Sequence, residues 1–534
     1  QYATAWALIH ALHARGVGGA GRPLATRFDA SVGYDLAGIR SDKVARFLDT
    51  MRDAGAVLRR LRDRLPPALR KTLDAEAPSR IVDLVTLSTF HGCPAEEIEA
   101  IAEHLLRRHG MHVVIKLNPT LLGYEAVDLL LRGRLGFDEV VLDRQAFDQD
   151  LRWDEALAVF ERLSPLAERL GLTLGAKFSN TLLVKNTRRT LAGEVVYLSG
   201  PPLHPIAIQL ADRFFQATDG RVPVAFSGGV EAENFADTVA CGLAPVTTCT
   251  DLLKPTGYRR LPRYLKSLAA EMDQLDARSV PEFVVAKAGQ RLARGVTPAR
   301  ALVAAAARRN RSDYAHRVVA DPRYHAEANR STPARKGRLA LFDCASCNIC
   351  TLVCPNGAFF SVPIPPVRLE TCDLVIAGGA VRSRPAVFAT TREEQWVLYD
   401  GFCNDCGNCD PFCPEEGSPF RVKPRVFGNR SSFHAAASGD GILFEDGGDR
   451  LLARFAGVSY AVEFVVGTGR ISDGVVEAAL DAGHRLVATR ILAAAEGHVL
   501  PLWRYHALRL LREAVLKGIN PVTAGRPPTF APRS

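Results

Sequence analysis

The stretch 403–414 reads CNDCGNCDPFCP, and the stretch 344–355 reads CASCNICTLVCP. Both follow the pattern C-x₂-C-x₂-C-x₃-C-P, which places four thiols within eleven positions and closes on proline. The eight cysteines are Cys344, Cys347, Cys350, Cys354, Cys403, Cys406, Cys409 and Cys413. Only four further cysteines occur in the 534 residues, and they are widely spaced. Clustered thiols in a chain of this size indicate metal binding in a reducing compartment rather than a disulfide framework.

The doubled pattern indicates two [4Fe–4S] clusters. It is the ligand run of two-cluster bacterial ferredoxins, in which the fourth cysteine of each run ligates the other cluster. Three thiolates at x₂ spacing wrap a loop around one cubane, and the backbone N–H groups of that loop can point at its sulfides. We therefore expect one set of ligands to be Cys344, Cys347, Cys350 and Cys413, and the other to be Cys403, Cys406, Cys409 and Cys354. Structural zinc is the alternative, but it is normally held by two C-x₂-C pairs.

The composition is that of a globular protein of several domains, with 47% apolar and 23% charged residues. There is no run of 18 or more apolar residues, so we expect no transmembrane helix, and no signal peptide is recognisable. The chain opens with Gln1 rather than methionine, so we expect its true start to lie upstream. With the unpaired thiols, these features predict a cytoplasmic protein.

The positive charge is concentrated in one segment. The net charge is +9, and residues 281–340 hold 13 Lys and Arg against 4 Asp and Glu, so the rest of the chain is neutral. This segment is either a docking surface for an acidic partner or an anionic cofactor, or an Arg-rich, solvated helical connector. Nucleic-acid binding is not expected, because no recognisable nucleic-acid motif accompanies the charge.

Short apolar runs alternate with amphipathic helix patterns over residues 25–250. In the helix pattern over 94–110, Pro94 suits the first helical position and Gly110 the C-terminal cap. Its apolar face consists of Ile98, Ile101, Leu105 and Leu106. The strand candidates are 25–33, 81–90, 112–120, 139–144, 172–180, 195–200, 222–229 and 244–250. This alternation predicts an α/β fold, a (β/α)₈ TIM-type barrel built on a parallel sheet.

Several motifs fall at the ends of these strands: TLSTFHGCP (86–94), KLNPTLLGYE (116–125), SGG (227–229) and LLKPTGYRRL (252–261). With FCNDCGNC (402–409), they make the chain resemble the selenate reductase iron–sulfur subunit family. That family joins a flavin barrel, similar to those of dihydroorotate and dihydropyrimidine dehydrogenases, to an FAD/NADPH module and iron–sulfur clusters. The resemblance covers about residues 5–270 and resumes across the cysteine runs to about residue 440.

The chain departs from that family in two respects. Residues 270–343 contain no Gly-rich strand–loop–helix, so the FAD/NADPH module is missing there. The family's barrel also begins with a strand that would precede Gln1. The resemblance therefore implies a barrel with its N-terminal strands missing, and a separate NAD(P)H/FAD flavoprotein as the electron source.

The resemblance also implies FMN-binding residues. In the flavin barrels the lysine of K-L-x-P contacts the flavin and the S-G-G loop holds its phosphate. Carried over, these are Lys116 and the loop of Ser227, Gly228 and Gly229, helped by Thr248 and Thr250. A Gly-Gly loop that opens a helix presents backbone N–H groups to an anion. The alternative is that Lys116 pairs with a barrel carboxylate and that the glycines only permit a tight turn.

Four further side chains are catalytic candidates at the barrel mouth: Cys93, His91, Asn118 and Asn180. Cys93 precedes a helix, and a helix N-terminus lowers the pKa of a thiol, so a reactive thiolate is one interpretation and an inert buried residue is the other. His91, Asn118 and Asn180 either bind a planar heterocycle or satisfy backbone groups at strand ends.

We expect a dihydroorotate dehydrogenase-like barrel over 1–270, a basic helical linker over 271–340, a two-[4Fe–4S] ferredoxin-like domain over 341–430 and a small α/β tail region over 431–534. The last ten residues look disordered. The expected function is an iron–sulfur oxidoreductase subunit that passes electrons between a partner flavoprotein and a flavin-barrel site. Its small-molecule substrate is open, because no residue selects an oxyanion over a pyrimidine or a purine-like ring. The alternative is a non-catalytic electron-transfer or scaffold subunit with a degenerate barrel.

Overall fold

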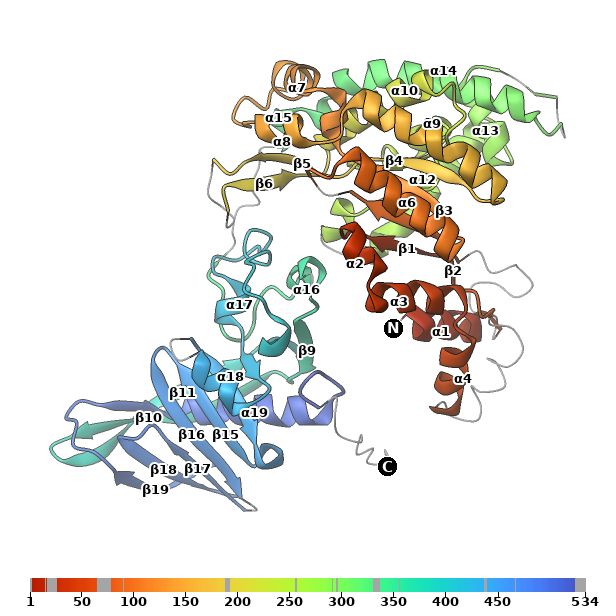
Figure 1. Ribbon diagram of the computed structural model, residues 1–534. Coiled ribbons are helices and arrows are strands. Elements are labelled where there is room, and N and C mark those ends of the chain that lie inside the picture. Colours follow the sequence, from red (N-terminus) through yellow and green to blue (C-terminus); the bar gives the residue numbers. More distant parts are fainter. Residues whose placement is uncertain are drawn as a thin grey trace. The chain divides into compact units, whose positions relative to one another are not determined.

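The computed structural model describes residues 2–14, 16, 26–64, 78–89, 91–187, 193–254, 257–290, 292–293, 296–329, 337–354, 356–436, 439–465 and 467–523. The chain divides into two compact units (Figure 1). The N-terminal unit comprises Gln1–Arg188, Gly193–Leu252 and Tyr258–Ser331. The C-terminal unit is built on Thr332–Ser534. No helix among the described residues is both long and apolar enough to cross a membrane.

A six-stranded sheet forms the centre of the N-terminal unit, and every neighbouring pair of its strands is parallel. In spatial order the strands are β1 (Phe28–Val32), β2 (Val82–Ser88), β3 (His112–Leu117), β4 (Leu174–Phe178), β7 (Val224–Ser227) and β8 (Val246–Thr247). Strands with intervening helices were expected at these six places. The described strands therefore form a parallel half-barrel.

Helices pack on the apolar face of this sheet, where Leu87, Ile115 and Phe178 join one core cluster with helix residues. The helices are α1 (Tyr2–Ala14), α2 (Leu36–Arg40), α3 (Asp42–Arg52), α4 (Gly55–Arg64), α6 (Ala95–His109), α7 (Tyr124–Asp128), α8 (Arg144–Gln149), α9 (Trp153–Arg169), α10 (Leu203–Ala217) and α11 (Phe235–Ala240). The predicted helix face of α6 is buried, and Gly110 caps it in the left-handed conformation. Pro94 takes the N-cap position, one residue earlier than expected.

Two of the expected barrel strands were wrong. Residues 139–144 form only an isolated bridge from Leu142 to Val184, because the chain turns there into α8. The run 195–200 forms β6 (Val195–Leu198), which pairs antiparallel with β5 (Leu182–Lys185) in a separate two-stranded sheet. Apolar periodicity alone cannot distinguish a barrel strand from one arm of such a hairpin.

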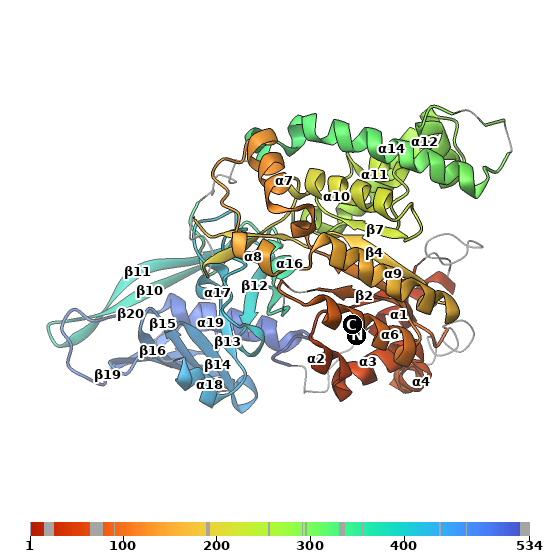
Figure 2. The ribbon, with the colours of Figure 1, turned by 45° about the horizontal axis from the view of Figure 1, so that its top comes forward.

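The expected basic linker belongs to the N-terminal unit. Its helices are α12 (Leu261–Gln274), α13 (Val280–Lys287), α14 (Arg300–Ala320) and α15 (Ala326–Asn329), with the short turn η5 (Pro322–Tyr324). Helix α14 lies against α10 and α11 (Figure 2). Tyr314 and Tyr324 are part of the unit's core, and Arg311 is buried against it. The helical prediction is confirmed, but this segment is packed structure rather than a connector.

The C-terminal unit contains a nine-stranded, mostly antiparallel sheet in the order β19-β18-β17-β16-β15-β14-β13-β12-β9 and a three-stranded sheet β11-β10-β20. The strands are β9 (Phe359–Pro363), β10 (Val367–Ala377), β11 (Ala380–Thr390), β12 (Glu394–Tyr399), β13 (Arg425–Phe427), β14 (Gly441–Glu445), β15 (Arg450–Phe455), β16 (Val458–Val465), β17 (Thr468–Ser472), β18 (Val476–Asp481), β19 (Leu486–Ile491) and β20 (Val499–Pro501). Helix α19 (Trp503–Lys517) packs on their shared core. The expected small tail region is thus the larger part of a β-rich unit, and residues 524–534, which hold the predicted disordered end, lie outside the described residues.

Candidate functional site

The two cysteine runs of the C-terminal unit meet at one end of a strand pair. Strand β9 pairs antiparallel with β12, and Phe359 lies opposite Leu398 at the end of this ladder. The first run ends at Cys354, just before β9 begins, and the second starts at Cys403, just after β12 ends. The antiparallel pairing therefore brings together two runs that are about fifty residues apart in the chain.

Both loops have the same backbone pattern. In the first loop Ser346 and Asn348, on either side of Cys347, have positive φ values of 49° and 64°. In the second loop Asp405 and Gly407, on either side of Cys406, have φ values of 53° and 75°. Left-handed residues alternating with right-handed ones turn successive N–H groups toward a common concave side, a geometry found around phosphates and iron–sulfur clusters. Each loop is thus shaped to enclose an anion.

Seven of the eight thiols lie near partners from the two expected crossed sets. One small cavity is lined by Cys344, Cys347, Cys350 and Cys413. Burial raises the pKa of Cys350 to about 12, and the rise is increased by Cys347, Cys344 and Cys413 of the same set and by Cys409 of the other. In the other set, burial raises the pKa of Cys409 to about 11, and nearby Cys403 and Cys354 add to it. Thiols this crowded and buried stay protonated unless a cation compensates their charge.

Backbone donors already point at several of these sulfurs. The N–H of Ala358 donates to Cys354 Sγ at 3.3 Å. Four other thiols each accept a backbone hydrogen bond, namely Cys347 from Ile349, Cys403 from Asp405, Cys409 from Phe420 and Cys413 from Glu415. Hydrogen bonds of this kind stabilise thiolate over thiol. The residues present therefore fit thiolate ligands of a metal cluster.

The two metal alternatives differ in how closely the four sulfurs of a set must approach one another. Among the described residues, no group of three or more His, Cys, Asp or Glu side chains is gathered closely enough to hold one metal ion. Four thiolates on one zinc, with Zn–S bonds near 2.3 Å, would lie about 4 Å apart. A [4Fe–4S] cubane holds its thiolates at four corners and separates them more widely.

In the N-terminal unit, a buried carboxylate joins the ends of two barrel strands. Asp150, at the C-terminal end of α8, has a side chain that is 1% exposed. Its oxygens accept hydrogen bonds from the Gly92 N–H at 2.7 Å, from Asn118 Nδ2 at 3.0 Å and from Thr120 Oγ1 at 2.7 Å. Its Oδ2 also lies 2.7 Å from His91 Nδ1. Burial alone would raise the pKa of Asp150, but these hydrogen bonds and the His91 charge lower it below its usual value.

The His91–Asp150 pair fixes one nitrogen of the imidazole and leaves the other open. Nδ1 faces the carboxylate, whereas Nε2 has no hydrogen-bond partner within the described part of the chain. The ring stacks on Tyr197 of β6 with centroids 6.2 Å apart, and its side chain is 18% exposed. An oriented imidazole with one accessible nitrogen can donate or accept a proton.

Asn118 and Asn180 are used within the protein. Asn180 Nδ2 donates to the Asn118 Oδ1 at 2.7 Å and to the Thr89 carbonyl at 3.0 Å, and its Oδ1 accepts from Ser88 at 3.3 Å. With Asn118 bound to Asp150, both amides satisfy groups at the ends of β2, β3 and β4. This geometry favours the second of the two interpretations for these asparagines.

Cys93 is 3% exposed at the start of α6. Burial raises its pKa to about 12, and the charges of Glu97 and Asp150 add to the rise, so the expected lowering by the helix terminus does not prevail. The structure favours the inert buried residue.

We expect Cys93 to resist alkylation in the native protein. With a pKa of about 12, only about one thiol in ten thousand is ionised at pH 8, and the sulfur is covered. Exposed Cys249 should react first with iodoacetamide. Mass spectrometry of the labelled peptides, with denatured protein as the control, measures both rates. Equal labelling of the two cysteines in folded protein would contradict this assignment.

Two lysines lie side by side on the polar face of the sheet. Lys116 of β3 is paired in register with Lys177 of β4. Burial lowers the pKa of Lys116. Burial and the neighbouring Lys116 lower the pKa of Lys177 to about 8, against the opposing pull of Asp29. Lys116 forms no ion pair with a carboxylate among the described residues, contrary to the alternative expected for it. The pair forms a cationic patch suited to an anionic ligand.

The loop after β7 is tightly packed. A side chain at Gly228 would meet Ala207 Cβ at 2.9 Å, and one at Gly229, whose φ is +54°, would overlap the Gly200 carbonyl. Ser227 Oγ donates to the Ser179 carbonyl at 2.9 Å. The expected tight turn is therefore present, and close approach of neighbouring backbone explains why both positions are glycine.

The two threonines have different surroundings. Thr248 Oγ1 donates to the Val230 carbonyl at 2.9 Å, so its hydroxyl supports the loop rather than reaching outward. Thr250 begins the turn η3 (Thr250–Leu253) that follows β8. The loops after the last two strands of a TIM barrel are its usual phosphate position, and β7 and β8 are the last two strands of the described parallel sheet.

Sequence reasoning missed Asp150 and Lys177. Asp150 lies in the turn between α8 and α9 and belongs to no motif, so only the fold brings it to His91. Lys177 had a detectable signal, since it is a charged residue inside the apolar strand LGAKF.

Comparison with known proteins agrees with a TIM-barrel-like N-terminal unit. Residues 1–296 match the family described as oxidoreductase YgfK, N-terminal TIM-barrel domain. The chain belongs to the YgfK oxidoreductase family. The YgfK proteins of Escherichia coli strains K12 and O157:H7, each named as a proposed oxidoreductase, are both 38% identical to it over 288 residues. That match covers 50% of this chain and 28% of either relative, so the chain spans less than a third of their length.

Two solved structures also match part of the chain. They are DHODH of Eimeria tenella without ligand, at 18% identity, and the same enzyme in complex with ferulenol, at 17% identity. Both cover 45% of this chain, and 68% and 66% of their own chains, with a TM-score of 0.25. At that score the overlap does not establish a shared fold.

Proposed function

We propose that this member of the YgfK family passes electrons through two [4Fe–4S] clusters held by its C-terminal unit. The observation that carries the proposal is the gathering of seven thiols as two crossed sets would require, on two loops with the same left-handed backbone pattern. The ligands would be Cys344, Cys347, Cys350 and Cys413 for one cluster and Cys403, Cys406, Cys409 and Cys354 for the other. Such clusters supply one-electron transfer.

The proposal includes an FMN site on the polar face of the half-barrel. Lys116 and Lys177 would attract the negative charge of reduced flavin, and the loops after β7 and β8 would hold its phosphate. His91, held by Asp150, would exchange a proton with the substrate through Nε2. A separate NAD(P)H-dependent flavoprotein is the proposed electron source, because a two-cluster module needs a donor.

Cofactor content tests this function. After anaerobic isolation we expect about eight iron and eight sulfide per chain, with one FMN released by acid. The clusters should bleach with dithionite and recover in air-free oxidant. A colourless protein without sulfide would contradict the iron–sulfur assignment.

A second candidate is an electron-transfer subunit whose barrel binds no cofactor. It is favoured by the internal use of Asn118 and Asn180, which leaves their amides bound to protein groups. Full iron and sulfide content without any flavin, in protein supplied with excess FMN, would select this candidate over the first.

A further inference from the structure

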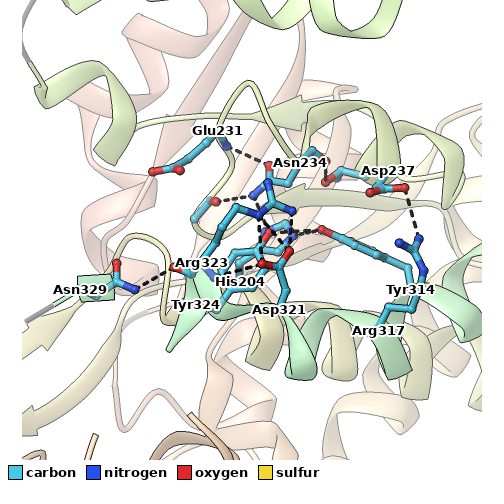
Figure 3. A network of polar contacts seen from close by, with 12 residues as sticks. His204, Glu231, Asn234, Asp237, Tyr314, Arg317, Asp321, Arg323, Tyr324 and Asn329 are labelled. Carbon is cyan, nitrogen blue, oxygen red and sulfur yellow. Dashed lines mark hydrogen bonds and ion pairs between the residues drawn. The ribbon is translucent and has the colours of Figure 1, made fainter. Parts of the chain in front are cut away.

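A buried polar network lies behind the glycine loop of the half-barrel (Figure 3). It joins His204 of α10, Asn234 before α11, Tyr314 of α14 and Tyr324 of η5, each no more than 2% exposed. Tyr314 and Tyr324 lie beyond residues 1–296, the part of the chain matched by the family. The segment expected to be a linker therefore supplies half of this network.

Each group of the network donates to the next, from Tyr324 through Tyr314 and His204 to the Gly228 carbonyl. His204 Nδ1 lies 2.7 Å from the Gly228 carbonyl, which can only accept, so Nδ1 carries the proton. His204 Nε2 then accepts from Tyr314 at 2.9 Å, and Tyr314 accepts from Tyr324 at 3.4 Å. Burial lowers the pKa of His204 to about 4, which keeps the ring neutral as this pattern requires.

Asn234 completes the network at the next carbonyl of the loop. Its Nδ2 donates to the Gly229 carbonyl at 2.9 Å and to the Tyr324 hydroxyl at 3.1 Å, and its Oδ1 accepts from the Glu231 N–H at 2.9 Å. Two successive carbonyls, those of Gly228 and Gly229, are thus held from the buried side.

The orientation of the next two N–H groups follows from peptide geometry. In a trans peptide the carbonyl and the following N–H point in opposite directions. The N–H groups of Gly229 and Val230 therefore point away from the network. Neither has a hydrogen-bond partner among the described residues. They form a fixed pair of donors on a loop that is partly exposed from Ser227 to Gly229 and buried at Val230.

We propose that the His204–Tyr314–Tyr324–Asn234 network positions the loop 227–230 so that the Gly229 and Val230 N–H groups bind the phosphate of a flavin mononucleotide. This inference rests on the proposed FMN site and assigns it positioning residues. Donors fixed before binding lose little freedom when the anion arrives, which is the general advantage of preorganisation.

The test compares FMN with riboflavin, which lacks the phosphate. The full chain is freed of flavin and titrated with each compound, and flavin fluorescence gives both dissociation constants. The dissociation constant of riboflavin divided by that of FMN measures how much the phosphate contributes to binding. A general loss of stability changes both constants alike and leaves this ratio unchanged. We expect His204→Ala and Asn234→Ala each to reduce this ratio about tenfold. His204→Asn, whose amide can donate from the position of Nδ1, should restore most of it.

Asn310→Ala is the matched control. Asn310 lies one turn before Tyr314 on α14 and donates to the Ala240 and Val284 carbonyls, away from the loop. It should leave the ratio unchanged. If folded Asn234→Ala binds FMN with the wild-type ratio, the positioning role is wrong while the FMN site stands. If the wild-type chain binds neither flavin, the FMN site fails and the inference with it.

Discussion

Replacing Cys347 with alanine should remove about four of about eight iron atoms per chain. The double variant Cys347→Ala with Cys413→Ala should lose no more iron than the single variant. The two thiols line the same cavity, so they are expected to serve one cluster. Cys347→Ala combined with Cys354→Ala should instead remove nearly all of the iron, because Cys354 lies with Cys403 and Cys409. Iron and sulfide assays on anaerobically purified variants measure these losses.

The double variants separate crossed from uncrossed ligation. If each run held its own cluster, Cys347 and Cys354 would share one cubane, and their double variant would keep about half of the iron. Cys372→Ala is the control, because Cys372 lies on β10, outside both runs, and should leave the iron content unchanged. Circular dichroism of each variant shows whether the strands around the loops remain folded.

Asp150→Asn should destabilise the strand ends of the half-barrel by about 3 kcal/mol at pH 7. The carboxylate accepts from Gly92, Asn118 and Thr120 and holds His91, and an amide of the same shape would present its own N–H groups to those donors. Hydrogen exchange of peptides within 86–120, read by mass spectrometry, gives the free energy of local opening.

The same variant has a defined pH dependence. The pKa of Asp150 is lowered in the folded protein, so its contribution is present above the pKa of the unfolded chain. That contribution is lost as the pH falls through the lower folded value, so the difference between wild type and Asp150→Asn should shrink below about pH 4. Asp148→Asn, at an exposed carboxylate of the same helix, should have little effect at either pH. A difference that stays constant down to pH 3 would contradict an ionised, hydrogen-bonded Asp150.

Local patterns predicted the parts of the fold that depend on neighbouring residues. The face of α6, six of the parallel strands and the helices over 258–329 follow from periodicity that each segment carries by itself. Periodicity did not predict the hairpin of β5 and β6 or the broad sheet over 394–491. Antiparallel pairing depends on partner strands that no single segment reveals. The prediction of a linker over 271–340 failed for the same reason, since Tyr314 and Tyr324 are buried by residues about a hundred positions away.

By itself, the sequence determined the cysteine spacing and hence the expected division of eight thiols into two sets, because a ligand run is set by chain geometry over a few residues. Only the tertiary structure decided what surrounds the strand ends. It paired Lys116 with Lys177, brought Asp150 to His91, protonated Cys93 by burying it and placed Tyr314 behind the glycine loop. Charge, burial and hydrogen bonding at these positions arise from neighbours distant in sequence, and a linear pattern does not contain them.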